Sequence, residues 1–237
     1  MINAEKIPWK RLSIEAAAIV TSILLAFAID AWWDERVSHG RSVAQLNTLS
    51  TEFVEVQSQL QRHEASLLGL RQAVSDLLIY IGPDSKLQPI DSLYALIDLS
   101  FRASTMELPT GSLKALLDTG DLSTIAGDEL KVLLAAWPAE VSRLRNQSGM
   151  LEENREEIIR YLHDKIPTLA VTHKTDQMNH YPKPSFVGKP EVIQRDMKVE
   201  GLFGNRGMLI EDTLDIVLEL EIQAANCVSP IAAELPN

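Results

Sequence analysis

The stretch "LSIEAAAIVTSILLAFAIDAWWDER", residues 12–36, decides how the rest of the chain is interpreted. From Leu12 to Trp33 it is mostly apolar, and a helix of roughly 22 residues at ~1.5 Å per residue is about 33 Å long. That length is enough to cross a bilayer. Basic residues precede this segment and acidic residues follow it, at Lys6, Lys10, Arg11, Asp30, Asp34 and Glu35. Because basic residues stay on the cytoplasmic side, we expect a cytoplasmic N-terminus and a periplasmic remainder.

Tryptophans lie at both ends of the predicted span. Trp9 precedes it, and Trp32 and Trp33 close it. Indole rings favour the level of the lipid headgroups, since they are largely apolar and carry one hydrogen-bond donor. We therefore expect Trp9 at the inner membrane interface and Trp32 and Trp33 at the outer one.

Two other interpretations of this segment compete with a membrane anchor. Ala26-Phe27-Ala28 matches the small-x-small pattern of a signal-peptide cleavage site after a short apolar run. Glu15 lies inside that run, and no Gly or Pro precedes the site, so an uncleaved anchor is favoured. A buried core helix of a soluble domain is the third interpretation.

Small residues repeat along one side of the predicted span. On a helical wheel, one third of the circumference holds Glu15, Ala18, Ser22, Ala26 and Asp30. Small side chains four residues apart let a second helix approach closely in lipid. Carboxylates at the two ends of such a stripe are costly against acyl chains and tolerable against a partner. The stripe predicts a docking face, although alanine is common in spans and both carboxylates can reach the headgroups.

The rest of the chain has helical periodicity. Apolar residues recur at steps of three and four from Leu46 to Ile81, interrupted by His63 alone, and Gly82-Pro83 ends the pattern. Nothing breaks the chain near Asp34, so we expect one helix to run from the span into this segment. The flanking positions lack the opposite charges that specify a partner coiled coil.

Four further helices are predicted, covering 90–102, 112–118 with Gly120 as its C-terminal cap, 130–162 with a bend at Pro138, and 208–227. The expected fold is all-α. In it, a transmembrane helix continues into a long periplasmic helix, and the first and second long apolar seams, 46–81 and 130–162, pack on each other in an antiparallel bundle.

Five segments follow from this pattern: a cytoplasmic tail (1–11), a transmembrane helix (12–33), a periplasmic helical bundle (34–166), an irregular Pro-rich loop (167–206), and a C-terminal helix and tail (207–237). An irregular stretch as long as 167–206 is unusual in a compact domain and suggests a functional or partner-binding loop, or a mobile one. The candidate binding residues of the loop are His180, Tyr181, Pro182, Lys183, Pro184 and Phe186.

Composition excludes several functions. The net charge of -11 argues against a nucleic-acid partner, and the single cysteine, Cys227, excludes an internal disulfide. Phosphate-loop, paired-cysteine and zinc-protease motifs are missing from the sequence. His163, His173 and His180, together with Asp164 or Asp176, could bind a metal, but their spacing matches no established ligand pattern and is more typical of solvated loop histidines. We expect no cofactor and no catalytic site.

Two segments resemble a family of uncharacterised bacterial single-span proteins. The first is "EAAAIVTSILLAFAIDAWWDER", residues 15–36, which is similar to that family's pattern of Glu, an apolar run ending at Ile-Asn or Ile-Asp, then Trp, an acid and Arg. The second is "LKALLDTGDLSTIAGDELKVLLAAW", residues 113–137, whose turn from Thr119 to Ile125, TGDLSTI, is similar to that family's SG-x-L-x-x-I turn. The resemblance implies an inner-membrane anchor with a helical extracytoplasmic domain, and it implies no activity.

These observations predict a non-enzymatic, single-pass bacterial inner-membrane protein. Its expected partners are the lipid bilayer and other membrane protein subunits, for example those of an energy-transducing respiratory or photosynthetic assembly. A homo-oligomeric sensor or channel-like assembly, in which the stripe pairs with copies of itself, is the alternative. A metal-dependent periplasmic enzyme is the third choice.

Overall fold

The computed structural model describes residues 9–102, 106–125, 127–172, 180 and 182–234. The helical residues whose side chains lie outside this description are 9–14, 16, 18, 38, 39, 123, 124, 233 and 234. The described residues form helices and no strand, which confirms the all-α prediction.

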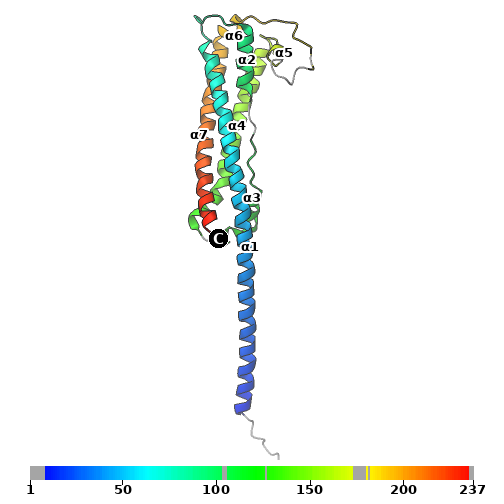
Figure 1. Ribbon diagram of the computed structural model, residues 1–237, viewed down its shortest axis with the longest axis vertical. Helices are drawn as coiled ribbons and strands as arrows, with labels where there is room; N and C mark the ends of the chain where they lie inside the picture. The colour runs from blue at the N-terminus through cyan, green and yellow to red at the C-terminus, as the bar shows by residue number, and fades with distance from the viewer. Residues whose placement is uncertain (1–8, 103–105, 126, 173–179, 181, 235–237) are drawn as a thin grey trace, which may run out of the picture.

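One helix dominates the molecule (Figure 1). Helix α1 runs without a break from Trp9 to Ile79, a length of 71 residues. At ~1.5 Å per residue it is about 106 Å long. The sequence holds no proline between Pro8 and Pro83, and the two glycines within α1, Gly40 and Gly69, are each isolated. The expected continuity across Asp34 is therefore confirmed.

The remaining helices are shorter than α1. They are α2 (Ile90–Phe101), α3 (Gly111–Thr119), the 3₁₀ helix η1 (Asp121–Thr124), α4 (Asp128–His163), α5 (Thr168–Thr172), α6 (Glu191–Gln194) and α7 (Met197–Glu234). Helix α4 continues through Pro138, and Gly120, at φ 75°, closes α3 as predicted.

The upper part of α1 packs side by side with α4 and α7 (Figure 1). Helices α1 and α4 run in the same direction, and α7 runs antiparallel to both. Helices α2 and α3 both pack against α1, α2 near its C-terminal end and α3 further toward its N-terminal end. The chain thus returns along α1 before α4 begins. The expected antiparallel packing of the seams 46–81 and 130–162 is therefore wrong, because α7 packs along both seams and takes the antiparallel position.

The hydrophobic core lies between these helices. Every residue of the predicted seam 46–81 is buried, at Leu46, Leu49, Phe53, Val56, Leu60, His63, Leu67, Leu70, Val74 and Leu77 of α1 and at Ile81 just after it. Helices α1 and α4 also meet directly, since the ring centroids of Phe53 and Trp137 are 5.0 Å apart. Aromatic pairs at such distances add to the stabilisation that burial provides.

The predicted irregular loop is shorter than 167–206. Helices α5 and α6 lie within it, and α7 begins at Met197 instead of Met208. Glycines at 201, 204 and 207 obscured the helical pattern of the first turns of α7, although Val199, Leu202, Phe203 and Ile210 recur on one face and are buried. A Cβ at Gly201 or Gly204 would meet nothing within 4 Å, so these positions face open space.

Candidate functional site

Residues 15–37 of α1, which we call the free section, extend beyond the other helices (Figure 1). Every side chain described in this section is exposed. Its large apolar side chains point to all sides of the helix, at Ile19, Val20, Ile23, Leu24, Leu25, Phe27, Ile29, Trp32, Trp33 and Val37. An apolar surface on every side is typical of a helix that an apolar environment surrounds.

Packing against the rest of the chain begins just after this section. Gln45 donates a hydrogen bond to Asp121 over 2.9 Å, and Leu46 is the first buried residue among the described side chains of α1. Among the described residues, no helix combines the length and the apolar character that crossing a membrane requires. The side chains of 12–14, 16 and 18, which belong to the predicted span, lie outside the described ones.

The residues of the predicted docking face lie on one unbroken helix. Glu15, Ser22, Ala26 and Asp30 are all exposed, and the side chain of Ala18 lies outside the described part. Because α1 has no kink or proline here, residues four apart stay on the same side. The helix therefore presents Ser22, Ala26 and Asp30 as a continuous narrow strip.

Trp32 and Trp33 close the free section. Both are more than half exposed, at 56% and 60%, and their ring centroids are 6.4 Å apart. The guanidinium of Arg36 lies 5.7 Å from the centre of the Trp32 ring, a cation–π distance. The side chain of Trp9 lies outside the described part.

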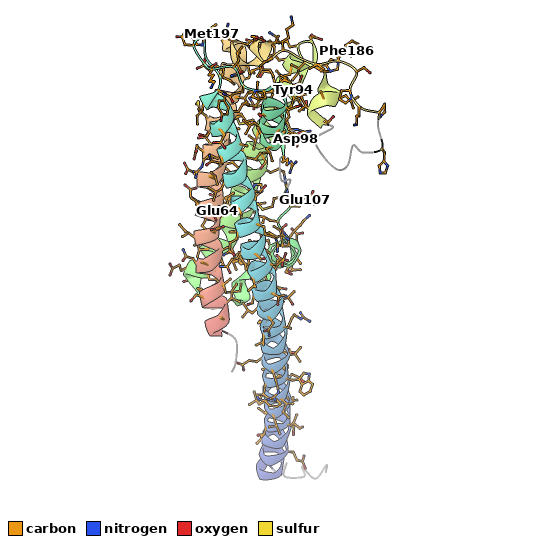
Figure 2. All side chains as sticks on the ribbon, turned by 45° about the horizontal axis from the view of Figure 1, so that its top comes forward. Glu64, Tyr94, Asp98, Glu107, Phe186 and Met197 are labelled. Atoms are coloured by element: carbon orange, nitrogen blue, oxygen red, sulfur yellow. The ribbon has the colours of Figure 1, made fainter. Side chains whose placement is uncertain are left out.

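The Pro-rich loop lies at the opposite end of the molecule, which we call the distal end (Figure 2). Phe186 and Val187 are about four-fifths exposed, at 79% and 81%. Together with Lys183 and Pro184 they line a cavity of about 380 Å³ against α2. His180 is exposed, and Tyr181 lies outside the described residues.

Buried side chains hold this loop in place. Tyr94 of α2 is 2% exposed, and its hydroxyl lies against the backbone of Gly188. Burial raises the pKa of that hydroxyl. Gln194 of α6 is fully buried, donates to the carbonyl of Tyr80 over 2.7 Å and accepts from the amide of Gln88 over 2.8 Å. The connection between α1 and α2 is thus fastened to α6.

An ion-pair cluster fixes the start of α7. Asp196 accepts hydrogen bonds from the Tyr161 hydroxyl at 2.8 Å, the Lys198 amide at 2.9 Å and the Lys165 ammonium group. Burial alone would raise the pKa of Asp196, but these hydrogen bonds keep it below its usual value. The ammonium groups of Lys165 and Lys198 also lie over the Tyr161 ring, at 4.4 and 4.5 Å.

The structure does not bring the two predicted binding surfaces together. The free section of α1 and the loop around Phe186 lie at opposite ends of the long helices (Figures 1 and 2). From Asp34 to Ile79, α1 covers roughly 45 residues, or about 68 Å. A single partner that contacts both surfaces must therefore extend over a comparable distance.

The histidines are scattered. The His163 imidazole lies 3.2 Å from the Thr168 hydroxyl, His180 is exposed, and His173 lies outside the described residues. Within the described part of the chain, no group of three His, Cys, Asp or Glu side chains is placed to hold a metal ion.

Sequence analysis missed the burial of Arg206. Arg206 is fully buried and donates to the carbonyls of Ser100 and Leu151 and to the Asn154 side chain, at 2.7, 3.1 and 3.4 Å. Its position on the apolar face of α7, one turn after Phe203, is the signal that would have found it. His63, which the seam of α1 already predicted to be buried, is 3% exposed, and neither ring nitrogen has a hydrogen-bond partner among the described residues.

Comparison with known proteins gives no match. Neither a protein-family model nor a curated protein nor a solved structure is similar to this chain. The resemblance to a bacterial single-span family stays a prediction that rests on residues 15–36 and 113–137.

Proposed function

We propose that this chain is a single-span bacterial inner-membrane protein that works without catalysis, as an accessory or scaffolding subunit of a larger membrane protein complex. In this proposal residues 12–33 of α1 cross the bilayer, and the part of α1 after residue 33 stands in the periplasm together with α2 to α7. The observation that carries it is the free section of α1, which is helical, exposed and apolar on every side.

Exposure of this section to water is unfavourable. Burying one large aliphatic or aromatic side chain stabilises a protein by about 1.5–3 kcal/mol. A protein partner of ordinary size covers one side of such a helix, whereas a bilayer surrounds it. Because Leu24 and Phe27 face away from Ser22 and Ala26, an environment on all sides accounts for the pattern best.

The small-residue strip supports docking to another span. Ser22 and Ala26 present little bulk, so the backbone of a neighbouring helix approaches closely and gains dispersion contacts. Glu15 and Asp30, at the ends of the strip, avoid acyl chains when they face a protein. The free section thus combines an apolar surface that lipid can surround with one strip against which a second helix can pack.

Self-association through the span is the alternative. In the periplasmic part, the apolar seam of α1 is already covered by α7 and α4, so it is not available for a coiled coil with a second copy. A homo-oligomer would therefore depend on the strip at Ser22 and Ala26.

Membrane insertion and orientation are tested with a single cysteine. Cys227 is buried, and burial raises the pKa of its thiol to about 11, so the unmodified chain is a low-background control. In cells with a permeabilised outer membrane, a membrane-impermeant maleimide should label Gln61→Cys. The protein should also stay in the membrane fraction after alkaline carbonate washing. Release by carbonate, or labelling of Gln61→Cys only after lysis, would refute the proposal.

Docking is tested by mild-detergent extraction, size analysis and mass spectrometry of the co-migrating chains. We expect stoichiometric foreign subunits that Ser22→Leu or Ala26→Leu releases. Val20→Leu, on the opposite side of the helix, is the matched control and should keep them. If the chain migrates only with copies of itself, the homo-oligomer is correct. If it migrates alone, the docking proposal fails.

A further inference from the structure

A small cavity lies between α2, α4 and α5 near the distal end, on the α2 side of the molecule where Figure 2 labels Asp98. Its volume is about 210 Å³. Phe101, Ile159 and Val171 contribute apolar walls, and Arg102 and Arg155 contribute cations.

The two arginines that line this cavity are each paired with one acid, but one donor is left over. Arg102 is paired with Asp98 over 2.9 Å, and Arg155 is paired with Glu152. The Nε atom of Arg155 is nevertheless buried and has no hydrogen-bond partner among the described residues. Each of these two cations thus has one acidic partner, and the Arg155 guanidinium keeps one donor that has no acceptor in the described structure.

A third guanidinium lies behind the cavity wall. The Cζ atom of Arg206 is 5.9 Å from the ring centre of Phe101, which lines the cavity. Arg206 is held by neutral acceptors alone, and its Nη2 atom has no hydrogen-bond partner in the described structure. Burial and, to a smaller extent, the nearby charge of Arg155 lower the pKa of Arg206 to about 10, while the charge of Glu152 opposes them.

This region therefore differs from the rest of the chain. Among the described residues, Arg102 and Arg155 form ion pairs with Asp98 and Glu152, whereas the hydrogen-bond partners of Arg206 are neutral, so the three arginines outnumber their paired acids by one, while the whole chain has a net charge of -11. A buried charge without a counter-ion is costly, and an anion bound beside it offsets that cost. Charge-assisted hydrogen bonds from guanidinium to carboxylate are among the strongest in proteins.

We propose that this cavity binds a small amphipathic monoanion, a carboxylate on a short hydrocarbon or aromatic body. The carboxylate accepts hydrogen bonds from Arg155, and the apolar body lies between Phe101, Ile159 and Val171. The site goes beyond the proposed function, because it depends on α2, α4 and α5 and not on the free section of α1. A ligand held there would join these three helices.

The probe for this site is 4-fluorobenzoate, with the neutral 4-fluorobenzyl alcohol as its comparator. The full chain, in lipid nanodiscs, is titrated with each compound and followed by ¹⁹F NMR. We expect saturable binding of the benzoate that is about tenfold tighter than binding of the alcohol, the difference of one charge-assisted hydrogen bond.

Two variants locate the site. Arg155→Met keeps the apolar stem, removes the donors and should weaken benzoate binding about tenfold. Arg160→Met, an exposed arginine on the same helix, is the control and should bind like the unmodified chain. Ile159→Phe fills the cavity and should abolish binding of both compounds.

Several results would overturn the proposal. Equal affinity for the benzoate and the alcohol would mean an apolar cavity without anion recognition. Unchanged benzoate binding in Ile159→Phe would place the ligand elsewhere. The absence of saturable binding at millimolar concentrations would exclude the site. Circular dichroism of each variant checks its folding. If Arg155→Met unfolds, the comparison of the two compounds and the Ile159→Phe variant decide whether the cavity binds the anion.

Discussion

Tyr94 and Gly188 are in direct contact, with the tyrosine hydroxyl placed where a β-carbon on the glycine would lie. The next nearest atoms to that position are Cζ of Tyr94 and Cδ of Pro167, at 3.4 and 3.5 Å. Of these atoms, only the hydroxyl oxygen is thus close enough to clash with a β-carbon at position 188. This contact attaches the exposed loop around Phe186 to the buried face of α2.

Gly188→Ala should therefore lower the free energy of unfolding by about 1–2 kcal/mol, since overpacking a fitted site costs that much. Tyr94→Phe in the same chain should recover most of the loss, because the remaining contacts are of ordinary length. Gly149→Ala, at an open helical position, should instead stabilise by about 0.5–1 kcal/mol. Denaturant unfolding measures all three, and equal losses with and without the Tyr94 hydroxyl would contradict the steric explanation.

His63 predicts a dependence of stability on pH. Burial lowers the pKa of the imidazole, so the unfolded chain binds a proton that the folded chain rejects below about pH 6.5. Folding stability should thus fall as the pH drops from 7 to 5. His63→Leu should be more stable than the unmodified chain by about 1 kcal/mol at pH 7, because a buried polar group without a partner is removed.

Below pH 6.5 the advantage of His63→Leu should grow by up to ~1.4 kcal/mol per pH unit. Unfolding by urea at several pH values measures it. His163→Leu, which replaces an exposed histidine, controls for effects common to any histidine substitution. A stability difference that stays constant between pH 7 and pH 5 would show that His63 does not resist protonation.

Arg206 connects three helices through its guanidinium. Arg206→Met should lower the free energy of unfolding by about 3 kcal/mol, because it leaves the carbonyl of Ser100 and the side chain of Asn154 buried without their donor. Arg145→Met, at an exposed position of α4, should change it by less than about 0.5 kcal/mol. Thermal unfolding compares the stability of the two variants. A small loss of stability in Arg206→Met would mean that water replaces the guanidinium as the hydrogen-bond donor.

Glu52 of α1 caps helix α3 from outside. Its carboxylate accepts from the backbone amides of Ser112 at 2.7 Å and Leu113 at 3.2 Å, while the N-cap residue Thr110 makes no such bond itself. Glu52→Ala should cost about 1–2 kcal/mol, the usual effect of removing a helix cap. Glu55→Ala, three residues further on and exposed, should be nearly neutral, and similar losses in both variants would contradict the capping role.

Local patterns in the sequence predicted the elements better than their arrangement. The seam from Leu46 to Ile81 is regular and free of proline, so its length and buried face followed directly from periodicity. Gly120 marked the end of α3 because a left-handed residue there favours glycine. The direction of α4 relative to α1 depends on how the chain returns through α2 and α3, which no local pattern encodes.

The buried polar groups were hardest to predict. Gln194 and Arg206 find their partners more than a hundred residues away, at Tyr80 and Ser100, so their role depends on tertiary packing. The cavity beside Arg155 likewise combines three helices that are far apart in sequence. In contrast, the free section of α1 was recognisable from composition alone, since its apolar character does not depend on contacts with the rest of the chain.

The unbroken course of α1 also has a mechanical consequence. Helix α1 passes from its exposed section into the packed core without an interrupting loop, so it behaves as a single rigid rod. Over ~68 Å of helix, a tilt of about 10° at one end displaces the other by roughly 12 Å. A small change in the tilt of the free section would therefore cause a large displacement at Phe186 and the distal cavities.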